Sequence, residues 1–320
     1  MSRPGGNKSA LYDVAATGLL AGVALLPRSL VLRSARAAGG FATRFLGEKR
    51  DRVEHNLRLA GAADPERGVA AAGASMAMTM FEFAWLLGQT RERVLAQAEH
   101  TGLDALREAL AGGRGVLLVG GHLGNWELIG QVATTTGAPL AGIARGLGTP
   151  RLERRIAAFR ERGGITTLVR GERGVSVAAY RWLRKGGILA CMMDRMSGGR
   201  RTVIPFLGEG LNVPVGPMVL AAKAGSAVVL GSATRRDDLR TDVSFRRLPE
   251  AETGDAVERA HAVGRALEAA VRARPAEWYW ISRRIGDAPE LRALKARRRE
   301  RREARDEARA TAGAEADDAL

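Results

Sequence analysis

Apolar residues occur in this chain as short continuous runs that alternate with longer stretches of helical spacing. Residues 116–119 form such a run between two glycines, which predicts a strand buried on both faces. From Leu123 onward the spacing of apolar residues is helical, until Gly137. Further apolar runs predict the other strands, at residues 138–144, 165–169, 188–193, 227–231 and, at a sheet edge, 241–248.

Stretches with helical spacing separate these runs. They predict helices over residues 44–59, 65–87, 91–110 (with a break at Gly102), 152–162, 175–183, 215–224 and 257–274. Strands that alternate with helices are typical of an α/β protein. We therefore predict an α/β fold, in which a central mixed sheet is flanked by helices.

The N-terminal segment is apolar but interrupted. Residues 14–26 are almost wholly apolar, and Pro27 separates them from a second apolar run. The uninterrupted run is shorter than the roughly 20 residues of a membrane span. We expect two helices that lie against a membrane, with Arg28, Arg33 and Arg36 at headgroup level. An ordinary buried helix and a true transmembrane anchor are the alternatives.

The pattern divides the chain into three segments. Residues 1–43 are expected to form the membrane-associated helices, and residues 44–288 the α/β domain. Residues 289–320 are expected to form a charged C-terminal helix and tail, because arginines dominate residues 291–309 and leave little apolar face.

Charge and cysteine content narrow the class of protein. A net charge of +15 calls for an anionic partner, which could be nucleic acid, anionic lipid or an acidic carrier protein. Aromatic residues make up 5% of the chain and none has RNA-binding spacing, so nucleic acid is the weaker choice, although the arginine-rich tail keeps it open. A single cysteine, Cys191, excludes internal disulfides and fits a cytoplasmic protein.

Candidate chemistry gathers where predicted strands end. His122 follows the first strand, Glu127 lies five residues further on, and Asp194 follows the strand at residues 188–193. The carboxyl ends of strands in open α/β sheets are where sites form. A histidine there can act as a general base near neutral pH, or it can simply cap the next helix. The sequence contains no metal-ligand cluster, so we expect no metal.

The block Gly-His-Leu-Gly-Asn-Trp-Glu around His122 resembles the H-x4-D/E motif of glycerolipid acyltransferases. Its neighbourhood is similar to the lipid A secondary acyltransferases and to their relatives that acylate phosphatidylinositol mannosides. Further blocks follow in the order of that family, and the resemblance covers residues 44–285. These blocks are Val53-Glu-His-Asn-Leu57, Arg160-Glu-Arg162, residues 203–208, Pro275-Ala-Glu-Trp-Tyr-Trp280 and Arg283-Arg284.

The resemblance implies an O-acyltransferase that moves a fatty acyl chain from a carrier thioester to a hydroxyl of a membrane glycolipid. We expect a lipid A precursor as acceptor, with phosphatidylinositol mannoside or a lysophospholipid as alternatives. The donor would be acyl-carrier protein or acyl-CoA, without a cofactor, at the cytoplasmic face of the inner membrane. A family member that has lost activity and only binds membrane is a further alternative.

The resemblance also implies roles for single residues. His122 would be the base, oriented by either Asp194 or Glu127. Backbone amides of residues 123–125, aided by Arg145, would stabilise the oxyanion. Phosphates would be held by a set of arginines, and Asn125 would also bind substrate. The arginines are Arg145, Arg160, Arg162 and Arg195.

Two further segments leave alternatives open. The Met- and Phe-rich residues 76–87 are either core or one wall of an acyl-chain groove between the sheet and the N-terminal helices. Trp278, Tyr279 and Trp280 beside arginines suit a membrane interface or a phosphate site.

Overall fold

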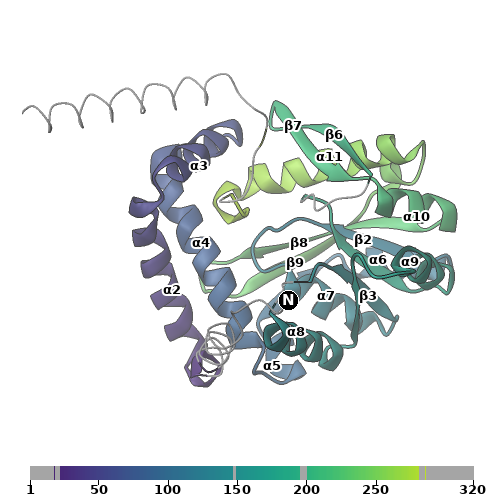
Figure 1. Ribbon diagram of the computed structural model, residues 1–320, viewed down its shortest axis with the longest axis horizontal. Helices are drawn as coiled ribbons and strands as arrows, with labels where there is room; N and C mark the ends of the chain where they lie inside the picture. The colour runs from purple at the N-terminus through teal and green to yellow at the C-terminus, as the bar shows by residue number, and fades with distance from the viewer. Residues whose placement is uncertain (1–17, 19–21, 147–148, 195–199, 281–284, 286–320) are drawn as a thin grey trace, which may run out of the picture.

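A computed structural model describes residues 18, 22–146, 149–194, 200–280 and 285. These residues form a seven-stranded sheet, which lies between helices (Figure 1). The strands of this sheet are β1 (Ala98–Thr101), β2 (Val116–Gly120), β3 (Leu140–Ala144), β4 (Ile165–Val169), β5 (Ile188–Met192), β8 (Ala227–Arg235) and β9 (Thr241–Arg247). A separate hairpin pairs β6 (Arg201–Phe206) with β7 (Glu209–Pro214).

The strand order in the sheet is β1-β9-β8-β2-β5-β3-β4. All neighbours run parallel except β8 and β9, which are antiparallel. The prediction of a mixed sheet flanked by helices is thus confirmed. The edge position predicted for residues 241–248 is wrong, because β1 covers the outer side of β9.

Helices cover both faces of the sheet, and the alternation along β2 shows why. Leu117 and Val119 pack on one side, while Val116 and Leu118 pack on the other. The first face is covered by α9 (Val175–Arg184), α10 (Gly216–Ala224), α11 (Ala256–Ala273) and the β6-β7 hairpin. The second face is covered by α5 (Arg91–Leu95), α6 (Leu103–Ala111), α7 (Glu127–Ala133) and α8 (Pro150–Arg162).

The N-terminal helices stand side by side at one end of the sheet (Figure 1). They are α2 (Arg28–Ala42), α3 (Glu48–Leu59) and α4 (Pro65–Leu86), and short 3-10 turns lie at Thr43–Phe45, Thr134–Thr136, Pro249–Ala251 and Pro275–Glu277. Asn125, beyond the end of β2, and Arg235, the last residue of β8, both bond to Glu82 of α4. The helices therefore cover the edge at which the strands end.

α4 is the one described helix that is long and apolar enough to cross a membrane. An 18-residue window within this 22-residue helix has a mean hydropathy of 1.3, but 56% of that window is buried inside the protein. It also carries the fully buried carboxylate of Glu82. These observations favour a core helix, whereas Phe81 is 45% exposed and an acyl-chain groove along residues 76–87 stays a prediction.

The predicted break at Pro27 is present, because helical residues end at Leu25 and α2 begins at Arg28. The first helix otherwise lies largely outside the described residues. Placing Arg28 at headgroup level was wrong: its side chain is 12% exposed and bonds to Glu82. Arg33 and Arg36 are exposed, as expected. The three predicted segment boundaries stay predictions, and the C-terminal helix lies outside the described residues.

Two other expectations fail locally. The break predicted at Gly102 is present, since this residue has a φ of +68° and a side chain there would meet the carbonyl oxygen of Phe245. The residues before it form α5 and the strand β1, however, instead of a continuous helix. The helix predicted from residue 215 begins at Gly216, after a hairpin that was not predicted. Leu207 and Gly208 both adopt positive φ at its tip, as a tight hairpin turn requires.

Candidate active site

His122 and Asp194 meet at the edge where β2 and β5 end. The two strands are parallel neighbours, with Gly120 paired to Met192, so the residues two steps beyond each strand lie together. The Nδ1 atom of His122 lies 2.7 Å from Oδ1 of Asp194, and the His122 amide donates to Oδ2 at 2.8 Å. Asp194 is 1% exposed, whereas the His122 side chain is 16% exposed.

The carboxylate fixes the tautomer of the imidazole. Ionised Asp194 only accepts hydrogen bonds, so the Nδ1 atom of His122 carries the proton and Nε2 keeps a lone pair. The Nε1 atom of Trp278 donates to Oδ2 of Asp194 at 2.7 Å, which holds the carboxylate from a second side. This arrangement is that of a general base with an orienting acceptor.

The loop of residues 121–126 carries His122 out of the sheet. The helix begins at Glu127 rather than at Leu123, because Gly124 has a φ of +51°. The amide of Leu123 donates to the Gly121 carbonyl at 2.8 Å, and that of Gly124 donates to the Glu277 carbonyl at 3.0 Å. These two amides are therefore occupied and not free to bind an oxyanion, whereas an oxyanion role for the Asn125 amide stays a prediction.

Glu127 does not contact His122 in this arrangement. Its carboxylate takes two hydrogen bonds from Arg160 of α8, at 2.6 Å from Nη2 and 3.1 Å from Nε. Burial lowers the pKa of Arg160, but Glu127 outweighs this and raises it, so the guanidinium stays charged. Of the two orienting residues considered, the geometry thus selects Asp194, and Arg160 is engaged with protein.

The other predicted binding residues fall in different places. Arg145 follows β3, is exposed and has no acidic partner among the described residues. Arg162 is exposed and donates to the Leu87 carbonyl at 2.8 Å. Asn125 is 1% exposed and donates to Glu82 at 2.8 Å, so it faces the interior rather than a ligand. Arg195 lies outside the described residues.

Aromatic side chains surround the imidazole. The rings of Trp126 and Tyr279 lie 4.7 Å and 6.4 Å from that of His122, measured between centroids. Trp278 and Trp280 are each 1% exposed, which overturns a membrane-interface role for these two side chains. An indole N–H that is buried needs an acceptor, and this rule could have pointed from Trp278 to a buried carboxylate.

Two further buried side chains, Glu82 and Cys191, lie on elements next to the site. Glu82, inside the apolar stretch of α4, was missed by the sequence analysis although a charge in such a stretch signals a buried partner. Cys191 is buried, and burial raises the pKa of its thiol to about 12. Its thiol is therefore inert, as expected for a residue that fills core space.

Fold and site together define an α/β enzyme with a candidate histidine base at the carboxyl ends of its strands. The chain belongs to the bacterial lipid A biosynthesis acyltransferases, a family that it matches over residues 8–286. It is therefore an acyltransferase, and the expected family is confirmed. Membership in this family does not support the alternative of a basic nucleic-acid-binding module.

Individual relatives fall into two groups. A phosphatidylinositol mannoside acyltransferase of Mycolicibacterium smegmatis is 27% identical over 221 residues, or 68% of this chain and 72% of that protein. The corresponding protein of Mycobacterium tuberculosis is 32% identical over 130 residues, or 40% and 41%. A lipid A biosynthesis lauroyltransferase of Escherichia coli is 25% identical over 281 residues, or 85% and 90%.

Proposed function

We propose that this protein transfers a fatty acyl chain from an acyl thioester to a hydroxyl of a membrane glycolipid, with His122 as the general base. The observation that carries the proposal is the bond between His122 and the buried Asp194, found at the ends of two neighbouring strands in a member of an acyltransferase family. The thioester would be that of acyl-carrier protein or acyl-CoA.

The reaction needs a single group that first accepts a proton from the hydroxyl and later donates it to the leaving thiolate. The Nε2 atom of His122 takes the proton of the acceptor hydroxyl while its oxygen attacks the thioester carbonyl. The negative charge of Asp194 stabilises the imidazolium that forms. The tetrahedral intermediate then expels the thiolate, which takes the proton from His122. One C–O bond forms and one C–S bond breaks, without an acyl-enzyme.

Two acceptors are proposed, and the similarities favour each in a different way. We rank a phosphatidylinositol mannoside first, because the mycobacterial relatives reach the higher identity, 32% over 130 residues. A lipid A precursor, expected from the sequence, is the second candidate, because similarity to the lauroyltransferase spans 85% of this chain. Both acceptors carry phosphate, which exposed Arg145 at the same edge of the sheet would bind.

We further propose a peripheral position on the cytoplasmic face of the inner membrane. Large apolar side chains are exposed on and beside α2, and Arg33 and Arg36 are exposed on the same helix. The exposed fractions are 87% for Leu25, 52% for Leu30, 56% for Phe41 and 76% for Phe45. A helix that presents apolar and basic side chains together suits an anionic lipid surface.

The test is an assay in detergent with purified protein, acyl-CoA or acyl-carrier protein as donor, and each glycolipid in turn. Free thiol is measured together with the mass of the lipid product. We expect thiol release with one glycolipid and a loss of roughly 10²–10⁴-fold or more in the folded His122→Ala variant. Wild-type turnover by that variant would overturn the mechanism, and the lipid profile of a deletion strain would identify the acceptor independently.

A further inference from the structure

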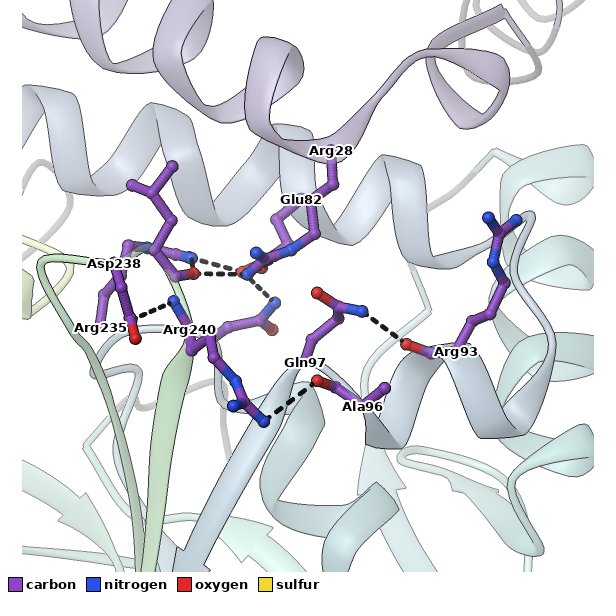
Figure 2. A network of polar contacts seen from close by, with 10 residues as sticks. Arg28, Glu82, Arg93, Ala96, Gln97, Arg235, Asp238 and Arg240 are labelled. Atoms are coloured by element: carbon purple, nitrogen blue, oxygen red, sulfur yellow. Dashed lines mark hydrogen bonds and ion pairs between the residues drawn. The ribbon is translucent and has the colours of Figure 1, made fainter.

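A buried ionic cluster lies beside the site and joins α4 to two other elements. The side chain of Glu82 is fully buried and accepts hydrogen bonds from Arg28, the first residue of α2, and from Arg235 at the end of β8 (Figure 2). The Nε atom of Arg28 lies 2.9 Å from Oε1, and Nη2 of Arg235 lies 2.5 Å from Oε2. Both guanidinium groups also donate to the Leu239 carbonyl, at 2.6 Å and 3.3 Å.

A fourth residue, Asn125, connects this cluster to the loop of residues 121–126, which carries His122 and is called the catalytic loop below. Asn125, three residues after His122, donates from Nδ2 to Oε2 of Glu82 at 2.8 Å. The orientation of its amide follows from chemistry, because a carboxylate accepts and only the NH2 group of Asn125 can donate. The side chain therefore points inward to α4 and holds the loop there.

The charges in the cluster require Glu82 to stay ionised. Burial alone would raise the pKa of Glu82, but Arg235, Arg28 and Asn125 outweigh burial and lower it. An ionised carboxylate makes stronger hydrogen bonds than a neutral one. The bond to Asn125 is thus charge-assisted and suited to holding an irregular segment.

Besides the two bonds of His122 to Asp194, main-chain hydrogen bonds hold the loop from the opposite side. The amide of Gly124 donates to the Glu277 carbonyl, and the amide of Tyr279 donates to the His122 carbonyl at 3.0 Å. Glu277 in turn accepts from the Arg235 amide at 2.6 Å. The loop is held between this C-terminal segment and α4, and Glu82 supplies the side-chain tie to α4.

We infer that Glu82 is a positioning residue that acts on His122 through Asn125, and that Arg28 and Arg235 hold Glu82 in place. Helix α2 thereby contributes to the geometry of the catalytic loop, although none of its residues need touch substrate. The kinetic part of this inference rests on the proposed acyl transfer.

The first experiment compares Asn125→Ala with a matched control, Gln89→Ala. Gln89 is also buried, and its amide donates to the carbonyls of Ala24 and Trp85 at 3.0 Å and 3.2 Å, away from the loop. We expect Asn125→Ala to lower kcat about 10–100-fold, since a displacement of about 1 Å can cost that much, with KM within about threefold. The control should keep kcat within about threefold of wild type.

The second experiment is a double-mutant cycle on kcat with Glu82→Gln and Asn125→Ala. If Glu82 acts through Asn125, the double variant should be no slower than the slower single variant. Effects that multiply would overturn the inference, as would equal kcat values for Asn125→Ala and Gln89→Ala. Should Glu82→Gln fail to fold, the comparison of the two amide variants still decides.

A spectroscopic measurement separates this inference from the proposed function. The Nδ1 proton of His122, bonded to Asp194, should give a downfield proton resonance in nitrogen-15-labelled protein. We expect it to shift or broaden in Asn125→Ala and to stay unchanged in Gln89→Ala. An unchanged resonance in Asn125→Ala overturns the positioning role, even if every acyl acceptor proves wrong.

Discussion

At the scale of single residues, the tautomer of His122 depends on one carboxylate. Within the part of the chain that the structure describes, the oxygens of Asp194 accept from the His122 amide, the His122 Nδ1 proton and the Trp278 indole. In Asp194→Asn one oxygen becomes an NH2 group, which can face Nδ1 and move the proton to Nε2. We expect kcat to fall roughly 10²–10⁴-fold in the thiol-release assay.

The double variant with His122→Ala provides the control for this prediction. Because Asp194 is expected to act through the imidazole, Asp194→Asn should cause no further loss once His122 is absent. Wild-type kcat in a folded Asp194→Asn protein would contradict the assignment and return Glu127 to consideration.

Two arginines that the sequence treated alike should behave differently. Arg145 is exposed without an acidic partner among the described residues, so Arg145→Ala should chiefly raise KM for the phosphate-bearing substrate. Arg160→Ala instead leaves the carboxylate of Glu127, whose side chain is 10% exposed, without its guanidinium partner. This variant should therefore lower Tm as well as kcat. Steady-state kinetics and thermal unfolding of both variants check this, and a lower Tm for Arg145→Ala alone would contradict it.

At the scale of elements, the catalytic loop depends on close approach of its backbone to β8. A side chain at Gly124 would clash with the Ala233 carbonyl oxygen, and the residue has positive φ. Gly137 also has positive φ, but nothing lies within 4 Å of the position of its side chain. We expect Gly124→Ala to lower activity and Tm far more than Gly137→Ala, and equal effects would show that φ alone matters.

The elements that the sequence predicted correctly are those with a local sequence signal. β2, β4 and β5 each begin directly after a glycine and are rich in apolar residues, and each lies within about one residue of its predicted bounds. β1 is the polar segment Ala-Glu-His-Thr, and only its pairing with β9 makes it a strand. The β6-β7 hairpin turns at Leu207, a residue type that seldom takes positive φ, so no turn signal was visible.

The sequence predicted that His122 and Asp194 belong to the site, but not which carboxylate bonds to the imidazole. His122 and Asp194 both follow apolar strands, and that position marked them. Whether Asp194 or Glu127 reaches the imidazole depends on the register of β2 with β5, which one sequence does not contain. Glu82 was missed because its partners Arg28 and Arg235 are distant in sequence, and because Arg28 was expected at lipid headgroups.

At the scale of the whole molecule, the N-terminal helices have two different faces. One side of α2 packs against α4 and brings Arg28 to Glu82. The other side exposes Leu30 and Phe41, eleven residues and about three turns apart, and the ring of Phe45 lies 5.5 Å from that of Phe41. Deleting residues before Arg44 would therefore remove part of the buried cluster together with the apolar surface, and would not test membrane binding cleanly.

Substitution of the exposed face alone gives the cleaner test. We expect the triple variant Leu30→Ser, Phe41→Ser and Phe45→Ser to sediment less with anionic vesicles, because these side chains are 52%, 56% and 76% exposed and would enter the lipid interface. Higher salt should weaken the remaining binding, since Arg33 and Arg36 act through charge. The matched control is Val177→Ser with Val203→Ser, which changes side chains that are 51% and 57% exposed on α9 and β6. Thiol release in detergent should be unaffected in either variant. Equal loss of sedimentation in both variants would mean that the apolar surface of α2 is not the part that meets the membrane.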